Sequence, residues 1–263
     1  MFQAGLVLSP YDSRDFKFNV AFTLGAMKIP LEYEQEKVPF IYDQGNTQMC
    51  CACAYNSIRY MQEHDSSQSS LEEPLSPCFT YGDRDANENY EGMMIRNCLS
   101  KGVSDGSVLL KELPDFTDVN HAIALVNNRK EELLDKANAF TIDSYYVCSS
   151  RRDIQLAILA AKGVITGIPI YDSLYDVDNT GIVNYDPTKD IQNYGGHAVA
   201  IVGWKYINST FHWIVLNSWG NSWGDDGYCY LPESYPWIEN AYAIIDNHTK
   251  ETYKDYMTQY YQQ

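Results

Sequence analysis

Two apolar runs late in the chain, residues 197–205 and 211–217, are separated by only five residues. Both runs are rich in β-branched and aromatic residues, which is typical of strands, and the short connection predicts an antiparallel hairpin. Positions equally far from the loop of a hairpin lie side by side. His197 and Asn217 are each ten residues from position 207, which lies inside the loop. We therefore expect these two side chains together at the open end of the hairpin.

An asparagine beside a histidine can fix the state of the imidazole ring. The amide oxygen of Asn217 would accept a hydrogen bond from one ring N–H of His197, which leaves the other ring nitrogen available in a defined tautomer. Trp219 follows closely and is expected to shield this hydrogen bond from water. Gly196, just before the histidine, leaves room for a substrate to approach.

A cysteine far upstream completes a possible catalytic set. Apolar residues at helical spacing predict a helix over residues 49–63, directly after the turn signal at residues 43–46. Cys50 lies in the first turn of this helix, where the helix dipole favours thiolate over thiol. A cysteine there is more often a buried filler, but His197 lies 147 residues downstream, within the spacing of about 130–150 that certain thiol hydrolases show. The set predicts Cys50 as a nucleophile.

Three segments of the sequence carry longer motifs. They are Gln44-Gly45-Asn46-Thr47-Gln48-Met49-Cys50, Gly196-His197-Ala198-Val199, and Asn217-Ser218-Trp219-Gly220-Asn221-Ser222-Trp223-Gly224 followed by Gly227-Tyr228. These motifs resemble those of the papain family of cysteine peptidases. The resemblance extends over residues 29–245 and is similar in style to the short bacterial, archaeal and phage members.

The resemblance implies a role for each matching residue. Cys50, His197 and Asn217 would be catalytic, and Gln44 would help to stabilise the oxyanion. Gly92, in Glu91-Gly92-Met93-Met94, would hydrogen-bond the substrate backbone. The positions implied in substrate binding, together with the two deduced above, are Gly92, Met93, Met94, Gly167, Gly196 and Trp219.

The chain departs from the family pattern beside the nucleophile. Thr47-Gln48-Met49 replaces the Cys-Gly-Ser of the family, so that a family disulfide cannot form. Gln48 also adds bulk near the pocket for the residue just before the scissile bond. Cys51 stands where plant and animal members carry tryptophan, and core filling is the expected role for Cys51 and Cys53. The seven cysteines, an odd number in a long chain, favour reduced thiols in a cytoplasm.

Helical periodicity and strand-like runs divide the chain into two halves. Helices are expected at residues 93–101, ending at the cap Gly102, at 119–137 and at 152–161, and further strands at 140–147, 163–171 and 227–231. The predicted fold is α+β and papain-like, with a helical lobe, an antiparallel barrel-like lobe and the active-site cleft between them. The expected divisions are an N-terminal extension (1–29), a helical lobe with the nucleophile (30–137) and a β lobe with His197 and Asn217 (138–263).

Composition limits the partners. The net charge of −16 opposes binding to nucleic acid or to an anionic membrane surface. No apolar stretch is long enough to span a membrane, and the N-terminus lacks the basic region of a secretory signal, so a cytoplasmic location is expected. No second cysteine pair at zinc-ligand spacing follows Cys50-Cys51-Ala52-Cys53, so a structural zinc site is not expected. We predict a monomer without metal or organic cofactor that acts on a peptide or protein, with a protein inhibitor as a further candidate partner.

Two other functions remain open at this point. A papain-like peptide ligase or amidase would share the acyl-enzyme, and ligation would differ only in the nucleophile that resolves it. A catalytically silent peptide-binding module is the other alternative, although the presence of Gln44, Cys50, His197 and Asn217 favours an active enzyme.

Overall fold

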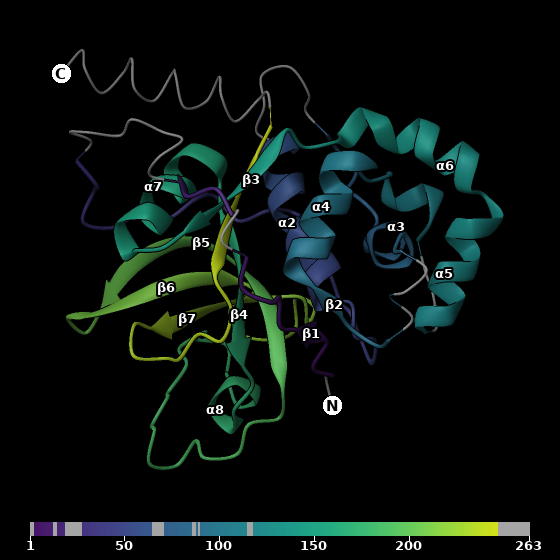
Figure 1. The fold of residues 1–263 in the computed structure, drawn as a ribbon. Coiled ribbons are helices and arrows are strands. Elements are labelled where there is room, and N and C mark those ends of the chain that lie inside the picture. The colour runs from purple at the N-terminus through teal and green to yellow at the C-terminus, as the bar shows by residue number, and fades with distance from the viewer. Residues whose placement is uncertain are drawn as a thin grey trace.

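The computed structural model describes residues 3–12, 15–18, 28–64, 71–85, 88, 90–114 and 118–246. Figure 1 shows helices α2 to α6 gathered on one side and the large sheet on the other, with α7 against the sheet. The helices are α2 (Cys50–His64), α3 (Pro77–Gly82), α4 (Ile95–Ser104), α5 (Val119–Asn128), α6 (Lys130–Ala137), α7 (Arg151–Ala161) and α8 (Asp172–Tyr175), with 3-10 turns at Leu110–Glu112 and Asn138–Phe140. The strands are β1 (Leu6–Val7), β2 (Met93–Met94), β3 (Ser144–Cys148), β4 (Val164–Pro169), β5 (Gly196–Ile207), β6 (Thr210–Leu216), β7 (Tyr228–Pro232) and β8 (Ala241–Ile245).

The sheet is antiparallel and open in the part of the chain that the structure describes. Its strand order is β3-β8-β4-β5-β6-β7, so that β3 and β7 form its edges. The predicted α+β class and two-part arrangement agree with this structure. The expected barrel-like closure does not occur, because a barrel requires its edge strands to pair and these two lie at opposite ends of the order.

The predicted hairpin is formed by β5 and β6. Its turn is tighter than expected, because Ile207 pairs with Thr210 and leaves only Asn208 and Ser209 in the turn, both with positive φ (50° and 65°). A register shift between Ile201 and Gly203 then displaces the strands. Because Ala200 pairs with Leu216, Asn217 lies diagonally across the hairpin from His197 and not directly opposite it.

The two faces of β5 belong to different cores. Ala198, Ala200 and Val202 contribute to the core beneath α2, whereas Val199 and Ile201 pack in a second core with α7. This division follows the alternation of side chains along a strand. The helix that carries Cys50 therefore lies directly against the strand that carries His197.

A buried ionic cluster fixes the far end of α2. The Arg59 guanidinium, 1% exposed, pairs with Glu63 at 2.5 Å and also with Asp246, just beyond β8. Gln62 donates to the carbonyl oxygens of Ala161 and Ile244, both at 2.9 Å. α2 is thus bound to the sheet side of the molecule through its last two turns.

Three of the predicted elements have different limits. The predicted helix over residues 119–137 is interrupted at Arg129 (φ −126°, ψ 22°) and becomes α5 and α6. Gly102 does not cap α4, because the helix continues to Ser104. It instead leaves room for Tyr55, since a Cβ there would lie 2.5 Å from the tyrosine oxygen. Gly106, with a φ of 81°, follows the helix end and donates to the Lys101 carbonyl at 3.1 Å. Phe140 lies in a 3-10 turn before β3.

We predict that Asp246→Asn lowers the free energy of unfolding by about 3 kcal/mol, because it leaves the buried Arg59 charge short of a partner. Urea unfolding followed by tryptophan fluorescence would measure this loss. The matched control is Asp226→Asn, since Asp226 is 79% exposed and pairs with Lys37 at 3.4 Å. Its loss should stay below about 0.5 kcal/mol. Equal effects of the two substitutions would contradict the assigned role of the buried cluster.

Candidate active site

Cys50 begins α2, and the turn before it is held by the Asn217 motif. Gln44 N–H donates to the Ser218 carbonyl at 2.9 Å, and Gly220 N–H donates to the Tyr42 carbonyl at 3.0 Å. These two backbone hydrogen bonds join the approach to α2 with the segment that follows β6. The predicted catalytic residues, 167 positions apart at their extremes, are thereby brought to one place.

The histidine and asparagine make the predicted hydrogen bond. His197 Nε2 and Asn217 Oδ1 are 2.7 Å apart, and both residues are buried. Asn217 Oδ1 also accepts from Ser218 N–H at 2.8 Å, which fixes the oxygen as the atom facing the ring. His197 therefore donates from Nε2 and keeps Nδ1 available toward Cys50. Trp219, 1% exposed, stacks on the imidazole at a centroid distance of 5.0 Å and shields the pair from water as expected.

The Cys50 thiol is electrostatically prepared for reaction. Burial alone raises its pKa, but hydrogen bonds with Cys51 and His197 and the positive charge of His197 together hold the pKa well below the usual value. The opposite holds at Cys51 and Cys53, where burial raises the pKa of each thiol well above that value. Among these three neighbouring cysteines, Cys50 is the one that carries thiolate character.

Gln44 presents its amide N–H₂ to the same region. Gln44 Oε1 accepts from the Ser218 hydroxyl at 2.7 Å, so Nε2 must point the other way. Nε2 donates to the Thr47 carbonyl at 2.9 Å and to the Gln3 carbonyl at 3.2 Å. Cys50 N–H, at the start of α2, has no partner within its own helix. The side chain of Gln44 and this N–H are the two donors available to a developing oxyanion.

Residues near the N-terminus of the chain lie across the site. β1 pairs in parallel with β2, with Leu6 opposite Met93. Met93 N–H donates to the Gly5 carbonyl at 2.9 Å, and Gly5 N–H donates to the Gly196 carbonyl at 3.2 Å. In Figure 1, β1 runs between the helical side and the sheet, close to the labels of β2 and β4. Residues 3–7 thus occupy the place where a peptide substrate was expected.

The glycines that were expected to contact a substrate leave space that residues 3–7 fill. A Cβ at Gly92 (φ 85°) would lie 2.5 Å from the Gly5 carbonyl oxygen, and one at Gly167 would lie 2.3 Å from a Leu6 methyl carbon. A Cβ at Gly196 would lie 3.2 Å from Leu6. The backbone of Gly92 is already engaged by Tyr81 and Arg84. Its predicted hydrogen bond to substrate therefore stays a prediction, as do the substrate contacts of Met93, Met94, Gly167 and Gly196.

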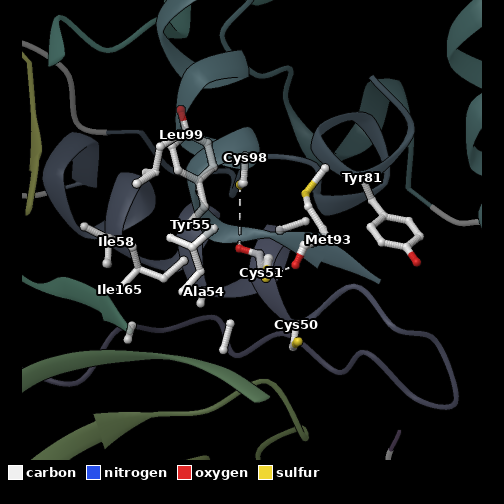
Figure 2. Close-up of a cluster of buried hydrophobic side chains, with 14 of the residues drawn as sticks. Cys50, Cys51, Ala54, Tyr55, Ile58, Tyr81, Met93, Cys98, Leu99 and Ile165 are labelled. Atoms are coloured by element: carbon white, nitrogen blue, oxygen red, sulfur yellow. Dashed lines mark hydrogen bonds between the residues drawn. The ribbon is translucent and has the colours of Figure 1, made fainter. Parts of the chain in front are cut away.

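Met93 and Cys51 form the wall beside the nucleophile. Met93 is 1% exposed and belongs to the core beneath α2, and Cys51 Sγ donates to its carbonyl at 3.0 Å. Figure 2 shows Cys50 at the edge of this cluster, apart from Cys98. Cys51 is therefore a core thiol that also supports the edge of β2, in agreement with the expected role in core filling.

No metal or membrane element is seen in the described residues. No group of three or more His, Cys, Asp or Glu side chains there is placed to hold a metal ion, and no helix among them has the length and apolar character to cross a bilayer. All seven cysteines are buried, and none of them forms a disulfide. The cytoplasmic location and the monomeric state stay predictions.

Three features of the site were not predicted from the sequence. Ser218 lies inside the quoted asparagine motif, but nothing in its spacing shows that its hydroxyl fixes the amide of Gln44. Tyr175 stacks on Trp219 at a centroid distance of 5.4 Å from a four-residue helix that has no periodicity to detect. Glu239 lies beside Gly167 and accepts from Ser9 N–H at 2.7 Å, an interaction with no local signal.

The lowered thiol pKa, the oriented imidazole and the paired amide donors together define a thiol-dependent acyl-transfer site. Comparison with known proteins agrees with this class. Residues 32–249 match the sequence model of the papain family cysteine proteases, and the chain belongs to that family.

Individual relatives match shorter parts of the chain. An uncharacterized peptidase C1-like protein of Acanthamoeba polyphaga mimivirus is 42% identical over 89 residues, which are 33% of this chain and 28% of that protein. Cathepsin B-like cysteine proteinase 4 of Caenorhabditis elegans is 34% identical over 89 residues, which are 34% of this chain and 25% of that protein. The chain thus aligns with only about a quarter of the length of these curated relatives.

Solved structures show the same fold over most of the chain. Xylellain, a cysteine protease from Xylella fastidiosa, matches with a TM-score of 0.74 at 23% identity and covers 92% of this chain and 96% of its own. The procathepsin B S9 structure from Trypanosoma congolense matches with a TM-score of 0.73 at 15% identity, over 92% of this chain and 85% of its own. These likenesses confirm the papain-like fold.

We predict that a far-ultraviolet absorbance titration of the wild-type chain shows one thiolate that persists well below the pH at which an ordinary cysteine is protonated, because the pKa of Cys50 is lowered. His197→Ala should move this titration to higher pH, because burial still raises the pKa of Cys50 while the opposing hydrogen bond and charge are lost.

His212→Ala is the matched control for this titration, because His212 is also buried in the β5–β6 hairpin but binds the Thr210 carbonyl. Cys50→Ser should abolish the low-pH signal and so assign it. An unchanged titration in His197→Ala would show that the imidazole does not lower the pKa of Cys50.

Proposed function

We propose that the chain is a cysteine endopeptidase that hydrolyses peptide bonds through an acyl-enzyme thioester. The observation that carries this proposal is the coupling of Cys50 to an imidazole whose other nitrogen lies 2.7 Å from Asn217 Oδ1. A thiol placed only to fill a core would have a raised pKa, as Cys51 and Cys53 do.

In the first half-reaction the Cys50 thiolate attacks the carbonyl carbon of the peptide. A C–S bond forms, and the carbonyl oxygen becomes an oxyanion that accepts from Gln44 Nε2 and Cys50 N–H. The C–N bond then breaks as His197 gives its Nδ1 proton to the leaving amine. Asn217 holds the ring throughout, so that this nitrogen stays directed at the reacting atoms.

In the second half-reaction water replaces the amine. His197, now neutral, takes a proton from the water as its oxygen attacks the thioester carbon. The C–S bond breaks, and Cys50 returns to the thiolate as the carboxylic acid product leaves. An amine that attacked in place of water would re-form a peptide bond, which is the ligase alternative.

The active site also explains why peptides are the proposed substrates. Met93 N–H at the edge of β2 and the Gly196 carbonyl at the start of β5 bind the two sides of Gly5. An extended peptide can pair its backbone with both groups, as residues 5–7 of this chain do. The small glycines at positions 92, 167 and 196 leave room for the main chain of a ligand.

An epoxide inhibitor of papain-like enzymes tests the nucleophile. We expect the wild-type chain to be labelled at Cys50 and to lose hydrolysis of a peptide library in proportion to the labelling, as measured by mass mapping and product analysis. Cys50→Ala should show neither labelling at this position nor hydrolysis. Labelling with no hydrolysis of any peptide, including trials with an added amine acceptor, would sink the peptidase proposal.

A second prediction concerns the oxyanion. Gln44→Ala should lower kcat/KM by about 100- to 1000-fold, because it removes one donor that acts on the developing charge. The control is Gln192→Ala, an exposed glutamine on the loop before β5, which should leave kcat/KM within about twofold. Steady-state kinetics on one peptide would compare the two. A loss of less than tenfold in Gln44→Ala would remove Gln44 from the proposed mechanism.

A further inference from the structure

Gly92, which the resemblance expects to hydrogen-bond a substrate, has both of its backbone groups turned into the protein. Its N–H donates to the Tyr81 hydroxyl at 3.0 Å, and its carbonyl oxygen accepts from Arg84 Nη1 at 3.2 Å. Met93, the next residue, directs its N–H to β1 instead, where the Gly5 carbonyl accepts it at 2.9 Å. A peptide bound along this edge would therefore meet the N–H of Met93 and not that of Gly92.

Arg84 holds the backbone that leads to Gly92 through one nitrogen atom. Nη1 donates to the carbonyl oxygens of Glu88 at 3.2 Å, Tyr90 at 2.9 Å and Gly92 at 3.2 Å. Nε donates to the Tyr81 carbonyl at 2.8 Å, and the central carbon of the guanidinium lies 4.3 Å from the centroid of the same tyrosine ring. The arginine side chain thus joins the end of α3 to the residues just before β2.

The charge of Arg84 is buried among backbone groups. The side chain is 9% exposed, and the hydrogen bonds that it makes within the described part of the chain all go to backbone carbonyl oxygens. A charged donor makes stronger hydrogen bonds than a neutral one, and buried carbonyl groups that lose their donor are costly. Without the guanidinium, we therefore expect residues 88–92 to move until their carbonyl groups find other partners.

Buried hydrogen bonds also tie this support to the helix that carries Cys50. Asn56 Nδ2 on α2 donates to the Thr80 hydroxyl on α3 at 2.8 Å, and both side chains are buried. Closer to the nucleophile, Cys51 Sγ donates to the Met93 carbonyl at 3.0 Å. The edge of β2 is thus connected to α2 both directly and through α3. A change in the support from α3 would alter where Met93 N–H lies relative to the nucleophile.

We propose that Arg84 and Tyr81 are positioning residues for the substrate, which keep Gly92 turned inward so that Met93 N–H meets the peptide backbone. The proposal rests on the peptidase function proposed above and concerns how that site binds its substrate. The φ of 85° at Gly92 permits the inward turn, because glycine adopts positive φ without strain. Both side chains act through the backbone of residues 88–93 and not on the reacting atoms. Their loss should therefore weaken peptide binding more than it slows the chemical step.

Steady-state kinetics of the full chain on one peptide separate these two effects. Arg84→Met removes the charged donor, and we expect KM to rise at least about fivefold while kcat stays within about twofold. Arg84→Lys keeps the charge without the planar fork, so it should recover part of the loss. The control is Arg151→Met, because Arg151 on α7 also lies over a ring, 3.5 Å from the centroid of Phe211, but is 40% exposed. It should leave both constants within about twofold.

Tyr81→Phe tests the hydroxyl alone and removes a single oxygen, so it stays informative if Arg84→Met fails to fold. The ring under the guanidinium remains, but Gly92 N–H loses its acceptor, and we expect KM to rise at least about threefold with kcat retained. The matched control is Tyr235→Phe, because the buried Tyr235 hydroxyl donates to the Pro169 carbonyl at 2.8 Å. Unchanged KM in both Arg84→Met and Tyr81→Phe would overturn the proposal, and so would a fall in kcat alone.

A measurement without hydrolysis keeps this proposal separate from the peptidase function. The rate at which a peptidyl epoxide labels Cys50, divided by the rate of its alkylation by iodoacetamide, reports peptide binding, because division cancels changes in the thiol itself. If this ratio falls at least about fivefold in Arg84→Met while no form hydrolyses a peptide, the positioning role is supported and the peptidase function is not. If wild type, Arg84→Met and Tyr81→Phe all hydrolyse peptides with the same KM, the function is supported and the positioning role is overturned.

Discussion

The packing of α2 against β5 is the constraint on which the site depends. The helix begins with Cys50, and the strand begins beside His197, so the distance between thiol and imidazole is set by how these two elements meet. Burial at that contact raises the pKa of a thiol unless a positive partner stands within reach. A small displacement of α2 would therefore do more than weaken the interaction between Cys50 and His197. It would leave Cys50 with the same raised pKa that burial gives Cys53.

This constraint explains the arrangement at the two ends of the helix. At its start, backbone hydrogen bonds tie Gln44 to Ser218, and hence the approach to Cys50 to the segment that holds His197. At its end, the Arg59 cluster ties the helix to the end of β8. Buried charges are costly unless paired, so such a cluster tolerates few alternative positions. Helix and sheet are joined at both ends, and the site lies at one of them.

The sequence could predict the parts of the site that depend on local pattern. The hairpin followed from two apolar runs and a short connection, and it was enough to place His197 beside Asn217, although the register shift near Gly203 makes the contact diagonal. Cys50 needed the motif resemblance, because a cysteine at a helix start is ambiguous alone. Pairings between residues that lie far apart in the sequence leave no such local pattern in it. Asp246 beside Arg59 and the open order of the sheet are set by tertiary packing that no single segment records.

The segment that fills the site escaped prediction for a further reason, which lies in how it is recognised. Residues 3–7 bind mainly through their backbone, and a backbone ligand requires only small residues and one apolar anchor. The glycines that indicated room for a substrate fit the chain's own segment equally well.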